Sequence, residues 1–305
     1  MEIRISRRRF GQLAIATTTI AGFSYLASKT SAQTPGLTIA GISSRGTVIT
    51  PDSSRTDVSS PSVETGDASD TSDTSQQVII SSIDLPTGRS QRGVTSAMPT
   101  DESISGFAYL IDGTPVVAIT PARTTRRKGR NPTRLSFPGI SRAEVTVSGL
   151  TPQQRLESLM VTPDGVLLGL VANKNGTPPV RLVEVNPNTG TFNVKLSLPS
   201  DQKYSTLAIC PNGTIYTTAV ANGATTLVRI NLAQASVTPL VQLRLNNNSW
   251  GNGLQSLLCN NANQLIAFGA PRYIQPNALY TVDLGSGAMA KLVDFDAARV
   301  AMRTT

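Results

Sequence analysis

The feature that most constrains the fold of this 305-residue chain is an internal repeat. Three segments align by eye, and they begin at Ser158, Thr206 and Ser256. Each contains two apolar runs joined by a tight turn, then a loop, then two further apolar runs. A looser copy runs from Gly106 to Val147. The turn residues of the four copies are 52, 48 and 50 residues apart; they are Gly113, Gly165, Gly213 and Asn263.

The composition of each copy indicates that the repeated unit is a β-sheet. Short runs of Val, Ile, Leu and Thr alternate with Gly, Asn and Pro-Asp-Gly turns, and there is no long amphipathic helical pattern. Proline fixes φ in such turns, and the residues after it tolerate positive φ. Four strands in a repeat of about 40 to 50 residues match one blade of a β-propeller. We therefore predict an all-β, propeller-like fold with four clear blades, with an antiparallel β-sandwich as the alternative.

The repeats resemble those of secreted bacterial β-propellers, such as the NHL and quinoprotein-like groups, over residues 104–296. The shared pattern is an apolar strand, Pro-Asp-Gly, a second strand and then a segment such as Leu182–Gly190 (LVEVNPNTG). The chain has no WD dipeptide, no paired kelch glycines and no calcium-binding nonapeptides. The resemblance implies a ring of blades. Residues 33–100, with Gln77–Ile83 as one strand, could supply a degenerate fifth blade; otherwise the ring is small or incomplete.

The first 32 residues have the three parts of an export signal. A charged region that includes Arg4 precedes a mostly apolar stretch, Leu13–Leu26. Small residues then lead to Ala32, which fits a signal-peptidase site. The apolar stretch is shorter than the 20 or so residues that a spanning helix needs.

The segment Ser6–Leu13 resembles the twin-arginine export motif, whose key positions in this chain are Arg7, Arg8 and Phe10. The resemblance implies export to the periplasm or the extracellular space. Contact with the membrane would occur only through the signal segment, before its cleavage. An ordinary secretory signal or a retained membrane anchor is the alternative.

Residues 33–76 differ in character from the repeats. Residues 33–50 contain Leu37–Thr50, which reads as a short β-hairpin. Residues 51–76 are rich in Ser, Thr and Asp and have little to bury, so we expect a flexible linker. Its aspartates lack the ligand pattern of a calcium loop and its closing Glu, so no cofactor, calcium included, is supported. The propeller-like domain is expected over residues 77–305.

The chain contains no histidine, which excludes Ser-His-Asp and Cys-His catalysis and histidine metal sites. Its two cysteines, Cys210 and Cys259, occupy the end of the first strand in adjacent copies, just before the turn. A disulfide needs Cα atoms within about 7 Å. Equivalent points on neighbouring blades come that close only near the ring axis. Two buried thiols are therefore favoured over a disulfide.

The positive charge of the chain is concentrated in one segment. The formal charge is +8, and residues after position 32 carry 22 basic and 18 acidic side chains. Six of these bases fall within twelve residues; they are Arg123, Arg126, Arg127, Lys128, Arg130 and Arg134. This basic segment lies between the second and third strands of the first copy, and it could bind an anionic envelope polysaccharide or protein. A solvated hairpin tip, or neutralisation by the acidic linker, is the alternative. The remaining residues are slightly acidic, so nucleic acid is not expected as a partner.

The only tryptophan, Trp250, lies in the Asn-rich segment Asn246–Gly253. An aromatic ring flanked by amides suits the binding of a carbohydrate. The favoured alternative is a connection between blades in which Trp250 fills the core.

Taken as a sequence, the chain is best interpreted as an exported cell-envelope binding or scaffold protein. The alternative is a hydrolase or lactonase-like enzyme with a carboxylate-bound metal at the ring axis. Asp112 and Asp164 are best explained as turn residues, and no pattern pairs two carboxylates. An enzyme is therefore the less favoured class.

Overall fold

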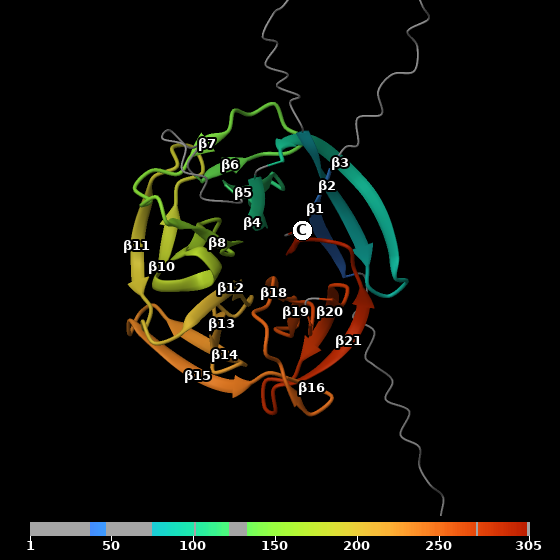
Figure 1. Ribbon diagram of the computed structural model, residues 1–305, viewed down its shortest axis with the longest axis vertical. Coiled ribbons are helices and arrows are strands. Elements are labelled where there is room, and N and C mark those ends of the chain that lie inside the picture. The colour runs from blue at the N-terminus through green and yellow to red at the C-terminus, as the bar shows by residue number, and fades with distance from the viewer. Residues whose placement is uncertain (1–36, 47–74, 101, 122–132, 273, 304–305) are drawn as a thin grey trace, which may run out of the picture. The chain divides into compact units, whose positions relative to one another are not determined.

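The computed structural model describes residues 37–46, 75–100, 102–121, 133–272 and 274–303, all within the compact unit Thr34–Thr305. Their strands form five separate, mainly antiparallel sheets. Figure 1 shows these sheets as the blades of a ring around a central axis. The fold is a five-bladed β-propeller, which confirms the all-β prediction. The β-sandwich alternative is wrong, because the strands divide into five sheets and not two.

Each blade runs from an innermost strand at the axis to an outermost strand at the rim. Blade 1 contains β22 (Arg299–Met302), β1 (Thr38–Gly46), β2 (Ser75–Asp84) and β3 (Arg89–Pro99). Blade 2 contains β4 (Glu102–Tyr109), β5 (Pro115–Pro121), β6 (Arg134–Ser136) and β7 (Val145–Thr146). Blade 3 contains β8 (Gln154–Val161), β9 (Leu167–Asn173), β10 (Thr177–Val185) and β11 (Phe192–Ser197), with the 3-10 helix η1 (Lys174–Gly176) between β9 and β10. Blade 4 contains β12 (Lys203–Ile209), β13 (Ile215–Ala221), β14 (Ala224–Asn231) and β15 (Ser236–Gln242). Blade 5 contains β18 (Ser256–Cys259), β19 (Leu265–Gly269), β20 (Ala278–Val282), β21 (Ala288–Asp294), β16 (Arg244–Leu245) and β17 (Asn248–Ser249).

The turn between the first two strands recurs in blades 2 to 5 with the backbone that the sequence requires. The turn residues all have positive φ, between 58° and 87°; they are Gly113, Gly165, Gly213 and Asn263. In blade 2 the Asp112 carboxylate accepts a hydrogen bond of 2.9 Å from the Thr114 N–H. That bond lowers the pKa of Asp112. The interpretation of Asp112 as a turn residue is therefore confirmed.

Blade 1 is built from both ends of the described chain, and it closes the ring. The innermost strand, β22, pairs antiparallel with β1, as in the pair Gly41↔Val300. On its other side β1 pairs with β2, which contains the expected strand Gln77–Ile83. The degenerate fifth blade is thus confirmed. Within the segment Leu37–Thr50, where a hairpin is expected, Thr38–Gly46 form one nine-residue strand of blade 1, and residues 47–50 lie outside the described residues. Blade 1 therefore includes residues well before residue 77.

The apolar core lies between neighbouring blades. Five clusters of buried side chains fill the five junctions. At the junction of blades 3 and 4, for example, Leu170 and Leu182 pack with Leu207 and Val228, and all four are at most 2% exposed. Blade-on-blade packing explains why the middle strands are apolar on both faces.

Candidate functional site

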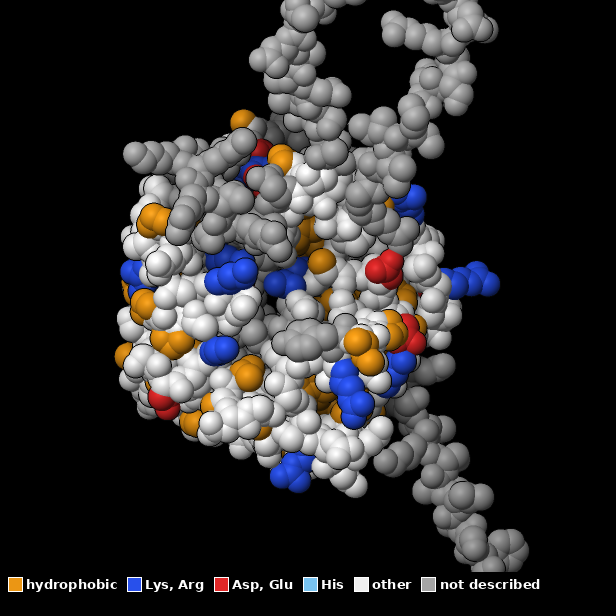
Figure 2. All heavy atoms as spheres, viewed as in Figure 1, with side chains coloured by type: hydrophobic (Ala, Val, Ile, Leu, Met, Phe, Trp, Pro, Cys, Tyr) orange, Lys and Arg blue, Asp and Glu red, His pale blue; other side chains and the backbone are white. Residues whose placement is uncertain are grey.

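The candidate site is a cavity of about 110 Å³ at the axis of the ring. Residues of β4, β8, β12, β18 and β22, the innermost strand of every blade, line it. Figure 2 shows a face of the propeller that is hollowed near its centre, where lysine or arginine side chains lie beside the hollow. The cavity wall is mostly apolar, and its polar side chains are few.

Equivalent residues of the five inner strands lie at one level around the axis. The Ser158 hydroxyl accepts a hydrogen bond of 3.1 Å from the N–H of Leu207 in the next blade. The Ser256 hydroxyl likewise accepts one of 3.0 Å from the Val300 N–H. A Cβ added to Gly106 would lie 3.1 Å from the Leu159 nitrogen. The equivalent positions are therefore Gly106, Ser158, Thr206, Ser256 and Arg299.

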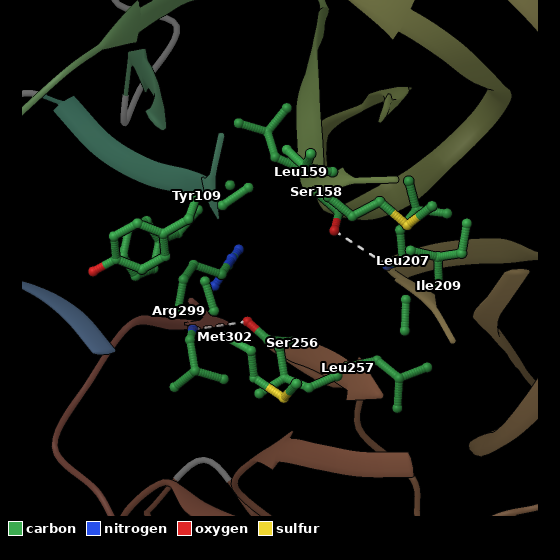
Figure 3. Close-up of a pocket in the computed structure, with 18 of the residues that line it drawn as sticks. Tyr109, Ser158, Leu159, Leu207, Ile209, Ser256, Leu257, Arg299 and Met302 are labelled. Atoms are coloured by element: carbon green, nitrogen blue, oxygen red, sulfur yellow. Dashed lines mark hydrogen bonds between the residues drawn. The ribbon is translucent and has the colours of Figure 1, made fainter. Parts of the chain in front are cut away.

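Arg299 projects into the cavity from the first residue of β22 (Figure 3). Its Nε donates to the Ser105 carbonyl at 3.1 Å. Its Nη1 donates to the Ala298 carbonyl at 2.9 Å and to Oε1 of Gln255. None of the described residues accepts a hydrogen bond from Nη2. Protein oxygens thus hold Nε and Nη1 in place, while Nη2 is left for a ligand.

The charge of Arg299 is not matched by a carboxylate in contact with it. No ion pair among the described residues includes Arg299. The pKa of Arg299 is lowered to about 10, mainly by burial; the nearby Glu157 carboxylate opposes this shift, and Arg155 adds to it. Glu157 is already paired, since Arg155 Nε donates to it at 2.7 Å and the Gly176 N–H at 3.1 Å. Arg299 remains positively charged at neutral pH, in a site that holds it partly out of water.

Cys210 and Cys259 form a disulfide, with Cα atoms 5.0 Å apart. The expectation of two free thiols is therefore wrong. Cys259 ends β18 and Cys210 follows β12, so both lie at the innermost strand of their blades, where neighbouring blades are closest. Cys259 also lines the axial cavity. The disulfide ties blade 4 to blade 5 beside the candidate site.

The structure describes one residue of the basic segment, Arg134. Arg123, Arg126, Arg127, Lys128 and Arg130 lie outside the described residues, as do Arg7, Arg8 and Phe10. Arg134 is buried against two carboxylates: both of its terminal nitrogens donate to Glu102, and Nε lies 2.5 Å from Glu144. Its side chain is 13% exposed. Arg134 therefore anchors β6 within blade 2 and is not an open cation for a partner.

Trp250 belongs to the core and not to a binding surface. The residue is 2% exposed, and its ring packs edge-on against Tyr280 at 5.3 Å between centroids. The Asn-rich segment before it forms the tip of the β16–β17 hairpin, where Asn246 and Asn247 have positive φ. Because a buried ring cannot stack on a sugar, the carbohydrate hypothesis for Trp250 is wrong and the core interpretation is confirmed.

Within the described part of the chain, neither a metal cluster nor a membrane-spanning helix is found. No three His, Cys, Asp or Glu side chains there gather closely enough to hold a metal ion. In the same residues no helix has the length and hydropathy needed to cross a membrane.

Comparison with known proteins shows similarity of fold. No protein-family model matches the chain, and no curated protein sequence does. Among solved structures, a calcium-binding protein, regucalcin, from Agrobacterium tumefaciens is 12% identical with a TM-score of 0.45, covering 72% of this chain and 70% of its own. Virginiamycin B lyase from Staphylococcus aureus is 15% identical with a TM-score of 0.39, covering 73% and 67%. An oligogalacturonate lyase in complex with manganese is 10% identical with a TM-score of 0.42, covering 73% and 62%.

Sequence reasoning misses Arg299, Ser158 and Ser256 as site residues. A signal for them exists in the repeat, because Ser158-Leu159 and Ser256-Leu257 occupy the same place in two copies. Arg299-Val300 fills that place in blade 1, but it stands after the last recognisable copy. Only the closure of the ring aligns it with the others.

Proposed function

We propose that this chain is a small-molecule-binding β-propeller that holds an anionic ligand in its axial cavity. The observation that carries the proposal is Arg299, whose guanidinium projects into the cavity with Nη2 unbonded to any described residue. Burying a cation costs free energy unless it is paired. An anionic group of the ligand would supply the missing partner through a charge-assisted hydrogen bond.

This proposal keeps the binding class that the sequence favours and moves its site from the basic segment to the axis. The alternative, a metal at the axis, would need carboxylate ligands there. The charged side chain that lines the described cavity is instead a cation, which repels a metal ion and attracts an anion. An anionic envelope partner of the basic segment stays a prediction.

The test is isothermal titration calorimetry of the full chain with butyrate, a small organic anion, beside an Arg299→Met variant. Hydrogen bonds to charged groups contribute about 1.5–3 kcal/mol, so the variant should bind about 10- to 150-fold more weakly. Arg229→Met is the matched control, because Arg229 is exposed on β14, away from the axis. Equal affinity of the wild type and the Arg299 variant would contradict the proposal.

We also propose that the protein acts outside the cytoplasm, in the periplasm or beyond the cell. The pattern Ser6–Leu13 supports this, and so does the Cys210–Cys259 disulfide, because such bonds persist mainly in oxidising compartments. Fractionation of cells that express Arg7→Lys/Arg8→Lys tests the proposal. The variant should remain in the cytoplasm with its signal uncleaved, whereas unchanged export would rule out the twin-arginine route.

A further inference from the structure

The polar side chains that line the cavity are mainly hydrogen-bond donors, whereas an ordinary polar pocket offers both donors and acceptors. Ser158 and Ser256 each use their hydroxyl oxygen to accept a backbone N–H from the next blade. Each hydroxyl therefore keeps its own proton to donate. Figure 3 shows the Arg299 guanidinium extending into the cavity that both serines line, while the Tyr109 hydroxyl points away from it. The side chains thus provide a cation and two O–H donors around one space.

A carboxylate complements this set, because it is an acceptor with two oxygens and no proton to donate. A neutral sugar or amide would leave its own donors without side-chain acceptors in this wall. Thr206, at the equivalent level of blade 4, does not line the cavity, and its hydroxyl bonds to Thr218 at 2.9 Å. Gly106, at that level of blade 2, has no side chain. The donors therefore come from blades 1, 3 and 5, so Ser158 lies across the axis from Arg299 and Ser256, and a small head group would bind between them.

The rest of the cavity is apolar, which determines what is attached to the carboxylate. Leucines of three blades, a valine and a phenylalanine form much of the wall; they are Leu159, Leu207, Leu257, Val300 and Phe107. Burying a polar or charged tail against such a wall is unfavourable. The volume of about 110 Å³ is smaller than a cavity of about 150 Å³ that accepts benzene. The space therefore suits a tail of only a few carbon atoms.

We infer that the ligand is a short-chain monocarboxylate, with its carboxylate held by Arg299, Ser158 and Ser256 and its aliphatic tail packed along the apolar channel. This inference rests on the proposed function and defines the chemical class of its ligand. Inorganic phosphate fits less well, because it carries more negative charge than the single Arg299 cation balances, and it leaves the apolar wall without contacts.

The first experiment compares acetate, butyrate, octanoate and inorganic phosphate by calorimetry on the full chain. Each buried CH2 contributes about 0.8 kcal/mol, so butyrate should bind about 15-fold more tightly than acetate. Octanoate should bind more weakly than butyrate because its tail exceeds the cavity. If phosphate binds as tightly as butyrate and depends on Arg299, the anion site stands and the monocarboxylate inference is wrong. If acetate, butyrate and phosphate all bind Arg299→Met as tightly as the wild type, or do not bind at all, both the inference and the proposed function fail.

The second experiment tests the two hydroxyls. Ser158→Ala and Ser256→Ala should each weaken butyrate binding about 3- to 10-fold, and Ser158→Thr should restore most of the loss because it keeps a hydroxyl. Thr206→Val is the matched control, since it removes a hydroxyl from the same level outside the cavity wall. Circular dichroism melting confirms that each variant is folded. Butyrate affinity that falls equally in Ser158→Ala, Ser158→Thr and Thr206→Val would overturn the role of the hydroxyls.

Discussion

At the scale of single residues, Arg299 stands out because the protein keeps a charge where an apolar side chain would fit. Its neighbours on the cavity wall are mostly apolar, and its hydrogen bonds go to two carbonyls and one amide. Replacing a poorly paired buried charge by an apolar residue is often neutral or stabilising. A cation kept under these conditions is typical of a site selected for binding and not for stability.

The pKa of Arg299 predicts how anion binding depends on pH. Burial lowers this pKa to about 10, so the guanidinium is charged below that pH and loses its proton above it. Butyrate affinity should therefore be constant between about pH 7 and 9 and fall above about pH 10. Calorimetry across this range, with circular dichroism to confirm folding, measures the dependence. Affinity that is unchanged at pH 11 in folded protein would be inconsistent with Arg299 as the anchor.

For Trp250, in contrast to Arg299, we expect a substitution to lower stability, because the role of its side chain is packing. Truncating a buried tryptophan costs about 3–5 kcal/mol, so Trp250→Ala should lower the free energy of unfolding by that amount, and Trp250→Phe by less. As the only tryptophan, it should also fluoresce at the short wavelengths of a buried ring, and added soluble sugars should not change its emission. A Trp250→Ala variant with normal urea stability would show that the ring is not in the core.

At the scale of elements, the disulfide between β12 and β18 should stabilise the ring. It joins residues separated by 49 positions, and bonds that close loops of this size contribute about 2–4 kcal/mol. The double variant Cys210→Ala/Cys259→Ala should lose that free energy of unfolding, measured by urea titration. Reductant should destabilise the wild type and leave the double variant unchanged. If reductant leaves the free energy of unfolding of the wild type unchanged, the disulfide is not present.

Most strands could be predicted from the sequence, because apolar runs and turns such as Asp164-Gly165 are local signals. The prediction for β1 differs from the structure because it, too, rests on a local signal. Ser44-Arg45-Gly46 has the composition of a hairpin turn, but Ser44, Arg45 and Gly46 pair with residues of β2 that lie far along the chain. Pairing between distant segments outweighs local preference in this strand. The disulfide could not be predicted, because the spacing places both cysteines at equivalent points without giving their distance from the axis.

At the scale of the whole propeller, the stability of the fold depends on ring closure by β22. Without this strand, β1 has an unpaired edge, and the cluster between blades 5 and 1 loses Val300. Deleting residues 299–305 should therefore abolish the cooperative thermal transition seen by circular dichroism, whereas a chain ending at Arg303 should melt like the full chain. If the shorter chain melts at the same temperature as the full one, the closed ring is not the unit of stability.

The candidate site belongs to this largest scale, which is why it could not be predicted from the sequence. Ser158, Ser256 and Arg299 come from three blades, and they become neighbours only when the inner strands surround one axis. The repeat predicts the blades, and nothing in it shows which side chains face the channel.

Anion binding at the axis can be observed in a crystal structure of the protein soaked with 3-bromopropionate, a short carboxylate whose bromine scatters anomalously. We expect one strong bromine peak in the cavity at the ring axis, with the carboxylate within hydrogen-bonding distance of the Arg299 guanidinium, and no such peak in Arg299→Met crystals. Bromine found only on the outer surface, or at the axis equally in both proteins, would contradict the proposal.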